Sequence, residues 1–449
     1  MTMLAITLLA GCNSYELFRL TGFEQATFSN DADILFIIDN SDSMQEEATA
    51  LATNMNVFIN KLTSAEGSNA PTATLSDAVD NYLRETTGGT LLIDYQLAIT
   101  TSSVYYDDGP SADIDPGEAG TFAFDSTSDV GAIVKRGQGD AAADFNTNLL
   151  CEATCWDQNM PSNPDYVCGD PLEGDVSEEY LDCLCGVGEW TGNCGTGMEQ
   201  PIEAALMTLC RTVENPPDDC YLFPSTSAIA FQTGDEQTNE TFLREGANTL
   251  VVIVSDEGDS SLRHEGHEPG EDAYDPAVPG DVETVVDEYL DIFEQFPNVV
   301  RFAVIGPAFD GTDGGCLDGA QEWGVERYQY IATETNGLYI PLTDIENDCA
   351  PTDFATNLED LGQLLSNLQT IFPLQSIPDE STIEVYVDGE QLERSEVTGE
   401  GADTVYGSGW TYDASENAVS FHGDAIPDYN QDVRIYYRPL GGMPRELPF

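Results

Sequence analysis

The fold is decided by residues 33–44, which read Asp33-Ile-Leu-Phe-Ile-Ile38-Asp39-Asn-Ser41-Asp-Ser43-Met44. Five consecutive apolar residues that end at a carboxylate predict a strand buried on both faces, the pattern of a parallel sheet. Directly after the polar turn, apolar residues recur at helical spacing over 44–62. A strand, a polar turn and a helix in direct succession are typical of an α/β fold.

The same alternation of strands and helices continues along the chain. Tyr95, Leu97 and Ile99 alternate with other residues, as in a strand. The fully apolar run 250–254 predicts another strand, and residues 299–305 predict the next. Helical periodicity predicts helices at 199–209, 281–296, 320–335 and 353–370. The third of these is expected to end at Asn336-Gly337. The predicted fold class is therefore α/β, with a doubly wound, mostly parallel sheet and helices on both faces.

The C-terminal part of the chain has a different pattern. Pro373 and Pro378 interrupt the helical periodicity, and beyond them alternating residues precede Asp388-Gly389, a hairpin signal. We predict a small antiparallel β domain over 378–449. The α/β domain is expected over 30–372, and its Gly-, Asp-, Ser- and Cys-rich stretch at 102–195 is interpreted as a disulfide-tied insertion outside the core.

The chain is strongly acidic for a globular protein. Its 449 residues include 82 Asp or Glu and 14 Lys or Arg, so the formal net charge is −68, while 41% of the residues are hydrophobic. That apolar content is enough for a packed core and argues against a disordered acidic chain. The charge disfavours nucleic acid and anionic lipid surfaces as partners and favours cations and a saline medium.

The N-terminal residues predict export. Residues 1–11 form a short and mainly apolar stretch. At its end, Leu9-Ala-Gly-Cys12 resembles the lipobox of bacterial lipoproteins, although Lys and Arg are absent from residues 1–9. We predict a signal peptide over 1–11, lipidation of Cys12 and a tether over 12–29. Asn13 favours the outer membrane of a bacterial envelope. A buried N-terminal strand with an incidental cysteine is the alternative.

The ten remaining cysteines are expected to form disulfides. Eight of them lie within 151–220, and an even number fits an oxidising compartment. Eight cysteines allow 105 pairings, so only Cys316 with Cys349 is predicted, by elimination. A zinc site is the alternative, but the spacings Cys-x3-Cys and Cys-x-Cys do not match zinc knuckles, and the cluster contains no His.

Candidate ligand residues follow the apolar strands. Ligands of doubly wound sheets gather at the carboxyl ends of strands, so Asp39 and Asp256 are expected to converge on one site. The turn after Asp39 adds the hydroxyls of Ser41 and Ser43. These oxygen atoms suit Mg²⁺, Mn²⁺ or Ca²⁺. Alternatively, Ser41 or Ser43 only caps the helix expected after the turn.

These motifs identify a resemblance to a known family. The strand ending in Asp39-x-Ser41-x-Ser43 resembles the first strand and metal ion-dependent adhesion site of von Willebrand factor type A domains. Gly195-Thr196 resembles the later threonine loop, with Thr191 as a second choice, and Ser255-Asp256 resembles the strand that ends in Thr-Asp. The resemblance covers about 30–372. It implies a divalent cation held by Asp39, Ser41, Ser43, Thr196 and Asp256.

The resemblance also implies how the protein functions. In such a site the cation accepts a carboxylate from a protein or polysaccharide ligand, which gives a role in adhesion. The lipobox, the cysteine-rich stretch and the C-terminal β part resemble those of uncharacterised lipoproteins from myxobacteria-like organisms. The alternative is a structural envelope lipoprotein in which the metal only stabilises the fold.

Enzymatic activity is not predicted. A hydrolase that uses the loop at 258–267 is a remote third possibility, because the two histidines of His264-Glu-Gly-His267 are three residues apart and lack the spacing of a zincin helix. Asp259 is expected to be a solvated turn residue. The acidic stretch 107–118 is expected to be a solvated loop, since it lacks the residue order of an EF-hand.

Overall fold

The structure is a computed structural model that describes residues 23–24, 31–41, 44, 94–104, 117–126, 131–136, 138, 141–156, 160–168, 176–187, 194–195, 199–221, 238–239, 241–244, 247–261, 281–308, 322–344, 350–351, 361, 371–374, 377–387, 389–398, 405–414, 417–422, 425 and 433–440. The chain forms two compact units. We call Asn30–Tyr82 with Leu91–Asn367 the α/β unit, and Met1–Ser29, Leu83–Thr90 and Leu368–Phe449 the β unit.

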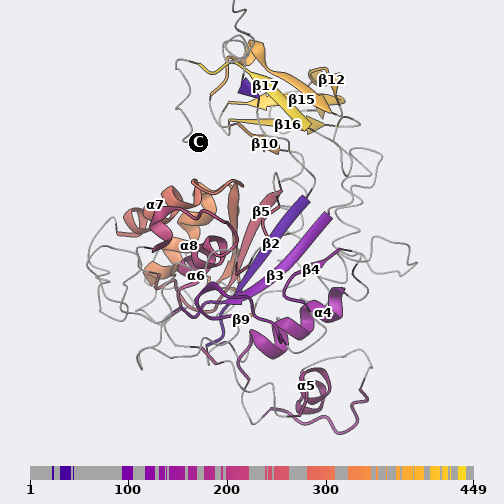
Figure 1. The fold of residues 1–449 in the computed structure, drawn as a ribbon, viewed down its shortest axis with the longest axis vertical. Helices are drawn as coiled ribbons and strands as arrows, with labels where there is room; N and C mark the ends of the chain where they lie inside the picture. Colours follow the sequence, from indigo (N-terminus) through magenta and orange to yellow (C-terminus); the bar gives the residue numbers. More distant parts are fainter. Residues whose placement is uncertain are drawn as a thin grey trace, which may run out of the picture. The chain divides into compact units, whose positions relative to one another are not determined.

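The α/β unit is built on one twisted sheet of six strands in the order β4-β3-β2-β5-β6-β7 (Figure 1). The strands are β2 (Asp31–Ile38), β3 (Asp94–Thr101), β4 (Val134–Lys135), β5 (Asn248–Val254), β6 (Val300–Gly306) and β7 (Leu338–Pro341). All neighbours run parallel except β4, which is antiparallel to β3. Counted along the chain, the order is 3-2-1-4-5-6, as in doubly wound folds. The predicted fold class is confirmed.

Helices cover both faces of this sheet. They are α4 (Ala141–Thr147), α6 (Pro201–Cys210), α7 (Asp281–Phe293) and α8 (Glu322–Glu334), whereas α5 (Glu178–Cys185) lies away from the sheet, and its Cys185 is bonded to Cys151 (Figure 1). Leu35 and Ile37 of β2 belong to the same hydrophobic cluster as residues of α6, α7 and α8. Phe36 points to the opposite face, where its ring meets Phe145 of α4 edge-on at 5.1 Å. Because successive residues of β2 are buried on opposite faces, the strand is apolar without alternation.

The remaining elements of the α/β unit are short. They are η2 (Glu118–Gly120), the π-turn η3 (Asn148–Glu152), η4 (Asp218–Tyr221) and the strand pair β8 (Thr343–Asp344) and β9 (Ala350–Pro351). Helix α8 ends before Asn336-Gly337 as predicted: Asn336 has φ 51°, and Gly337 N–H donates to the Ala332 carbonyl at 2.7 Å. The helices predicted over 44–62 and 353–370 lie outside the described residues, apart from Met44 and Leu361.

The stretch 102–195 does contribute to the core, contrary to the prediction. Val104, Ala119 and Phe122 are buried within the main cluster, and β4 extends the sheet at its edge. Short, glycine-rich segments gave no periodic signal, so their burial could not be recognised from the sequence. The cysteines of the stretch form disulfides, as predicted, and Cys210 and Cys220 beyond it form a fourth. The pairs are Cys151–Cys185, Cys155–Cys194, Cys168–Cys183 and Cys210–Cys220.

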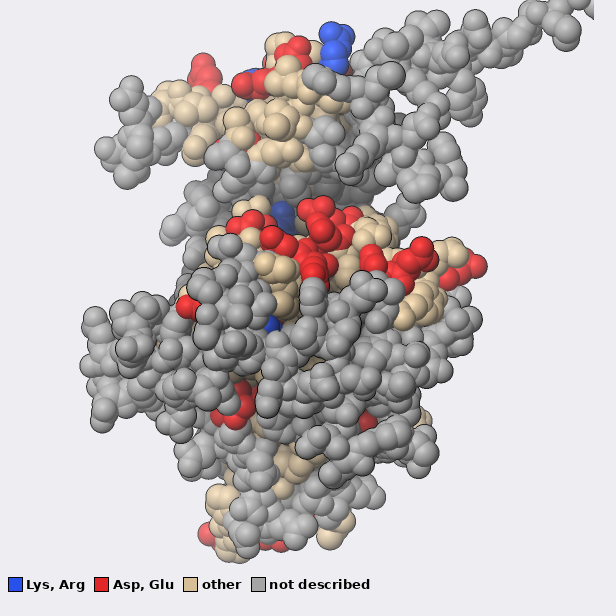
Figure 2. Space-filling model, turned by 90° about the vertical axis from the view of Figure 1, so that its left-hand side faces the viewer, with Lys and Arg blue, Asp and Glu red and all other residues tan. Residues whose placement is uncertain are grey.

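Cys316 and Cys349 lie outside the described residues, so their pairing stays a prediction. Within the described part of the chain, no helix is both long and apolar enough to cross a membrane. On the face drawn in Figure 2, carboxylate side chains are widespread among the coloured residues and basic side chains are sparse, as the net charge of −68 requires.

The β unit contains antiparallel sheets around a core of its own. Its elements are β1 (Phe23–Glu24), β10 (Ile371–Pro373), η6 (Glu380–Thr382), β11 (Glu384–Val387), β12 (Glu390–Leu392), β13 (Val397–Thr398), β14 (Val405–Tyr406), β15 (Gly409–Asp413), β16 (Ala418–His422) and β17 (Val433–Tyr437). The strand orders are β1-β17-β11-β12, β10-β16-β15 and β13-β14. The predicted hairpin is confirmed: β11 pairs with β12, and Gly389 in the turn has φ 80°.

Candidate functional site

The candidate site lies at the carboxyl ends of β2 and β5. These strands are neighbours, but the chain continues from β2 to one side of the sheet and from β5 to the other. Such a switch point opens a crevice in which doubly wound proteins bind ligands. The register pairs Ile38 with Val254, so Asp39 and Ser255 follow their strands side by side. The Asp39 N–H donates to the Val254 carbonyl at 2.9 Å.

Asp39 is buried, with 1% of its surface exposed. Its Oδ1 accepts a hydrogen bond from the Ser41 N–H at 2.9 Å, and its Oδ2 accepts one from Ser255 Oγ at 2.6 Å. Burial raises the pKa of Asp39 to about 6, against the lowering effect of Ser255 and Ser41, and the charge of Glu257 adds to the rise. Among the described residues Asp39 makes no ion pair. Its carboxylate is thus oriented, but not neutralised, by the described residues.

The loop before α6 is fastened to the turn after Asp39. The Gly195 N–H donates to the Asn40 carbonyl at 2.8 Å, and Ser103 Oγ donates to Asn40 Oδ1 at 2.8 Å. A side chain at Gly195 would collide with Ser103 Oγ and Asn40 Oδ1, so a larger residue there would displace the Ser103–Asn40 hydrogen bond. The disulfide of Cys194 with Cys155 holds the same loop.

Three of the predicted ligand positions are described, and two are not. Asp39, Ser41 and the half-buried Asp256 lie at the carboxyl ends of the two adjacent strands. Ser43 and Thr196 lie outside the described residues, as does the second choice Thr191. The neighbour of Thr196, Gly195, contacts the Asp39 turn directly. The position of Thr196 as a ligand stays a prediction.

Glu199 is a site residue that sequence reasoning missed. It is 1% exposed, its carbonyl accepts a hydrogen bond from the Ser260 N–H at 2.8 Å, and the next residue, Gln200, donates its N–H to the Ser102 carbonyl at 3.0 Å. Its carboxyl group is hydrogen-bonded to Glu257. Burial, the charge of Asp39 and the contact with Glu257 raise the pKa of Glu199 to about 10. The available signal was an acidic residue three positions after Thr196 and just before the helix.

The prediction for Asp259 is wrong. This residue is completely buried, and Arg327 Nη1 of α8 pairs with its Oδ2 at 3.2 Å. Its Oδ1 accepts a hydrogen bond from Ser261 Oγ at 2.5 Å and another from the Ile202 N–H at 3.3 Å. Arg327 comes from a helix 68 residues later, so only the tertiary structure could supply the partner that makes burial of Asp259 tolerable.

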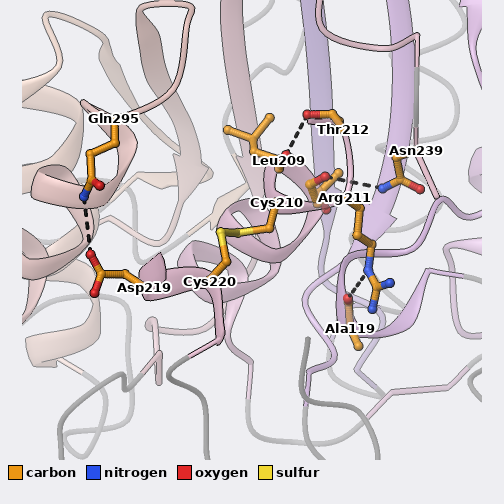
Figure 3. Close-up of a disulfide and its surroundings, with 10 residues drawn as sticks. Ala119, Leu209, Cys210, Arg211, Thr212, Asp219, Cys220, Asn239 and Gln295 are labelled. Carbon is orange, nitrogen blue, oxygen red and sulfur yellow. Dashed lines mark hydrogen bonds between the residues drawn. A yellow bond between two sulfur atoms is a disulfide. The ribbon is translucent and has the colours of Figure 1, made fainter. Parts of the chain in front are cut away.

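Helix α6 connects this site to the rest of the unit and is fixed at both ends. At its start, the Glu203 N–H donates to Ser261 Oγ at 3.0 Å, in addition to the contact of Ile202 with Asp259. At its end, Cys210 is bonded to Cys220, and the neighbouring Arg211 donates from Nε to the Ala119 carbonyl at 3.1 Å (Figure 3). Because both ends of α6 are held by these contacts, the loop that precedes α6 is attached to a fixed helix.

The donor atoms of the site fit a hard divalent cation. Carboxylate and hydroxyl oxygens of Asp39, Ser41 and Asp256 suit Mg²⁺, Mn²⁺ or Ca²⁺. Two buried oxygens at the same end of the sheet, Glu199 Oε1 and Ser102 Oγ, have no hydrogen-bond partner within the described residues. In the part of the chain that the structure describes, no three Asp, Glu, His or Cys side chains are grouped so as to hold a metal by themselves.

Comparisons with known proteins find only distant similarity to solved structures. Neither a family model nor a curated protein matches the sequence. Similar solved structures include a von Willebrand factor type A protein from Catenulispora acidiphila, the pilus adhesin RrgA from Streptococcus pneumoniae and the ArnB paralog VWA2 from Sulfolobus acidocaldarius. Each is 10% identical, with TM-scores of 0.29, 0.30 and 0.26.

The alignments cover 92%, 93% and 92% of this chain but only 59%, 57% and 58% of those chains. The chain thus spans less than two thirds of the length of these structures. Similarity this low supports no conclusion about function. The fold described above rests on the strand order and register of the sheet.

Proposed function

We propose that this chain is an interaction or adhesion protein whose α/β unit binds a divalent cation at the carboxyl ends of β2 and β5, and through it a partner. The proposal rests on the environment of Asp39. This residue is buried at the switch point of the sheet, and Ser255 and Ser41 orient it. A buried carboxylate is stable when charge or hydrogen bonds compensate it, and an exogenous cation supplies the charge that the described residues lack.

Asp39, Ser41 and Asp256, with Ser43 and Thr196, are the residues that would hold the cation. When bound, the cation supplies an electrophilic centre that accepts a carboxylate from a protein or polysaccharide ligand. The chain's own hydrogen bonds position the donors: Ser255 fixes one oxygen of Asp39, and Gly195 fastens the loop that leads to Thr196. The proposal includes no catalytic step.

The proposed location is the outer membrane of a bacterial cell envelope, with a lipid anchor on Cys12. The four disulfides support an exported protein, because disulfides persist in oxidising compartments. The motif Leu9-Ala-Gly-Cys12 supports the lipid anchor. Cys12 itself lies outside the described residues.

The first experiment measures cation binding by calorimetry with Mg²⁺, Mn²⁺ and Ca²⁺ on the full chain, on Asp39→Ala and on Ser41→Ala. We expect binding by the full chain and a large loss in both variants. Unchanged affinity in both variants would show that the site is assigned to the wrong residues. Circular dichroism of each variant controls for unfolding.

The second experiment separates adhesion from a structural role. The full chain is used to capture envelope proteins and polysaccharides with and without chelator, before and after the carboxylates of the extract are converted to amides. Adhesion predicts capture that needs both the cation and the free carboxylates. If Asp39→Ala instead unfolds the protein and no ligand depends on the cation, the metal only stabilises an envelope lipoprotein.

A further inference from the structure

Among the buried oxygens that lack a hydrogen-bond partner within the described residues, two belong to loops next to Asp39. They are Glu199 Oε1 and Ser102 Oγ, from side chains of residues that are each 1% exposed. An unpaired polar atom that is removed from water destabilises the folded state. In native proteins, a ligand, an ion or a water commonly supplies the missing interaction of such atoms. Both residues lie on loops next to Asp39.

The backbone around Glu199 determines where its side chain can reach. The Ser102 N–H donates to the Ile38 carbonyl at 2.9 Å, and the Ser102 carbonyl accepts from the Gln200 N–H at 3.0 Å. Through these two hydrogen bonds, Ser102 links the residue after Glu199 to the end of β2. On its other side, its carbonyl is bonded to the Ser260 N–H in the loop after β5. The charge of Asp39 acts on the Glu199 carboxyl group, which lies in the same crevice.

A neighbouring glutamate provides an internal comparison. Glu203 is four residues further along and fully buried, but its Oε2 accepts a hydrogen bond from the Tyr289 hydroxyl at 2.7 Å. Glu203 is thus supported by a protein group, the Tyr289 hydroxyl of helix α7. Glu199 has one oxygen towards Glu257 and the other without a partner among the described residues. Of these two glutamates, Glu199 is the one with an oxygen that has no partner within the described residues.

We propose that Glu199 is a direct ligand of the divalent cation, an assignment outside the five positions that the family resemblance supplies, and that the Ser102 hydroxyl is a further donor. The inference rests on the proposed cation site. With Glu199 the site has donors from the ends of β2, β3 and β5 and from the loop before α6. The Glu199 carboxylate adds to the negative charge around the cation and so to its affinity.

The test compares Glu199→Gln with Glu203→Gln by calorimetry with Ca²⁺ and Mn²⁺ and by luminescence of bound Tb³⁺, on the full chain. Glutamine keeps the size of the side chain and removes the charge. We expect Glu199→Gln to weaken cation binding at least about tenfold and to change the number of waters on bound Tb³⁺. Glu203→Gln should leave both unchanged. Ser102→Ala should have a smaller effect of the same sign.

Three outcomes are distinguishable. If Asp39→Asn abolishes binding and Glu199→Gln does not weaken it, Glu199 is no ligand and the inference fails, while the proposed function stands. If the unaltered chain binds no cation, the proposed function fails and the inference with it. If Glu199→Gln does not fold, Glu199→Asp replaces it: a shortened carboxylate should weaken binding, and unchanged affinity overturns the inference.

Discussion

The two ends of strand β2 carry aspartates that differ in how their charge is compensated. Asp33 near the amino end and Asp39 after the carboxyl end are both buried, and burial raises the pKa of each to about 6. Arg244 pairs with Asp33 through Nε at 2.7 Å and donates its backbone N–H to the same carboxylate at 2.7 Å. Asp39 instead accepts hydrogen bonds from the Ser255 hydroxyl and the Ser41 N–H.

This difference separates a structural ion pair from a candidate site. At the amino end the chain itself provides the cation, so Asp33 needs nothing from outside. At the carboxyl end Asp39, Glu199 and Glu257 interact with one another, and the described residues provide no basic partner for Asp39. A cation bound next to Asp39 would compensate its charge. The following variants test the comparison, from the largest expected effect to the smallest.

Replacing Arg244 by Ala should have the largest effect on stability. It leaves Asp33 buried without its cation, and breaking a buried pair costs about 3–5 kcal/mol. We expect the lower end, about 3 kcal/mol, because the Arg244 side chain is 24% exposed. Urea unfolding at pH 8, where Asp33 is charged, measures it. The control is Arg394→Ala, which removes an exposed pair with Glu380 and should cost below about 1 kcal/mol. Equal effects would contradict the comparison.

The pH dependence of stability should reveal Asp33. Its folded-state pKa of about 6 exceeds the ordinary value of 3.8, so the folded chain binds this proton more tightly than the unfolded chain. Its contribution is therefore fully present below pH 4 and is lost as pH rises through 6. The loss amounts to about 2–3 kcal/mol. Asp33→Asn should flatten the unfolding free energy between pH 4 and 6, in the presence or absence of divalent cations. An unchanged slope would mean that Asp33 is not buried as described.

Asp39→Asn should remove the stabilisation that the cation provides. Binding to the folded state alone adds about 2.7 kcal/mol at a free concentration of about 100 times Kd. The expected result is a higher Tm of the full chain in Ca²⁺ than in chelator, and no such difference in the variant. Asp33→Asn is the matched control, and it should keep the cation-dependent shift. A shift that persists in Asp39→Asn would place the cation elsewhere.

Ser255→Ala should have the smallest effect. It removes the hydroxyl that donates to Asp39 Oδ2 and leaves the carboxylate less well oriented. Loss of such a supporting hydrogen bond weakens cation affinity about tenfold, or about 1.4 kcal/mol. Calorimetry measures this, with Ser260→Ala as the control, since Ser260 contacts Glu199 through its backbone N–H. Equal losses in both variants would contradict the role assigned to Ser255.

Much of the fold could be predicted because its signals are local. Uninterrupted apolar residues such as Ile34–Ile38 and Leu250–Val254 indicate strands buried on both faces, and both are strands of the observed sheet. The even number of cysteines predicted disulfides, and four are observed. The core residues Val104, Ala119 and Phe122 were missed, because isolated apolar residues among glycines and serines have no period.

By itself, the sequence determined the α/β class, the antiparallel C-terminal part and the carboxylates that follow β2 and β5. These features depend on hydrophobic periodicity and on the polar residues that end an apolar run, and both can be recognised from consecutive residues. The tertiary structure decided which carboxylates are compensated. Arg244 lies 211 residues from Asp33, and Arg327 lies 68 residues from Asp259. Glu199 became a site residue only through hydrogen bonds to two other loops. Burial and charge compensation depend on neighbours that packing brings together, and such neighbours leave no local pattern in the chain.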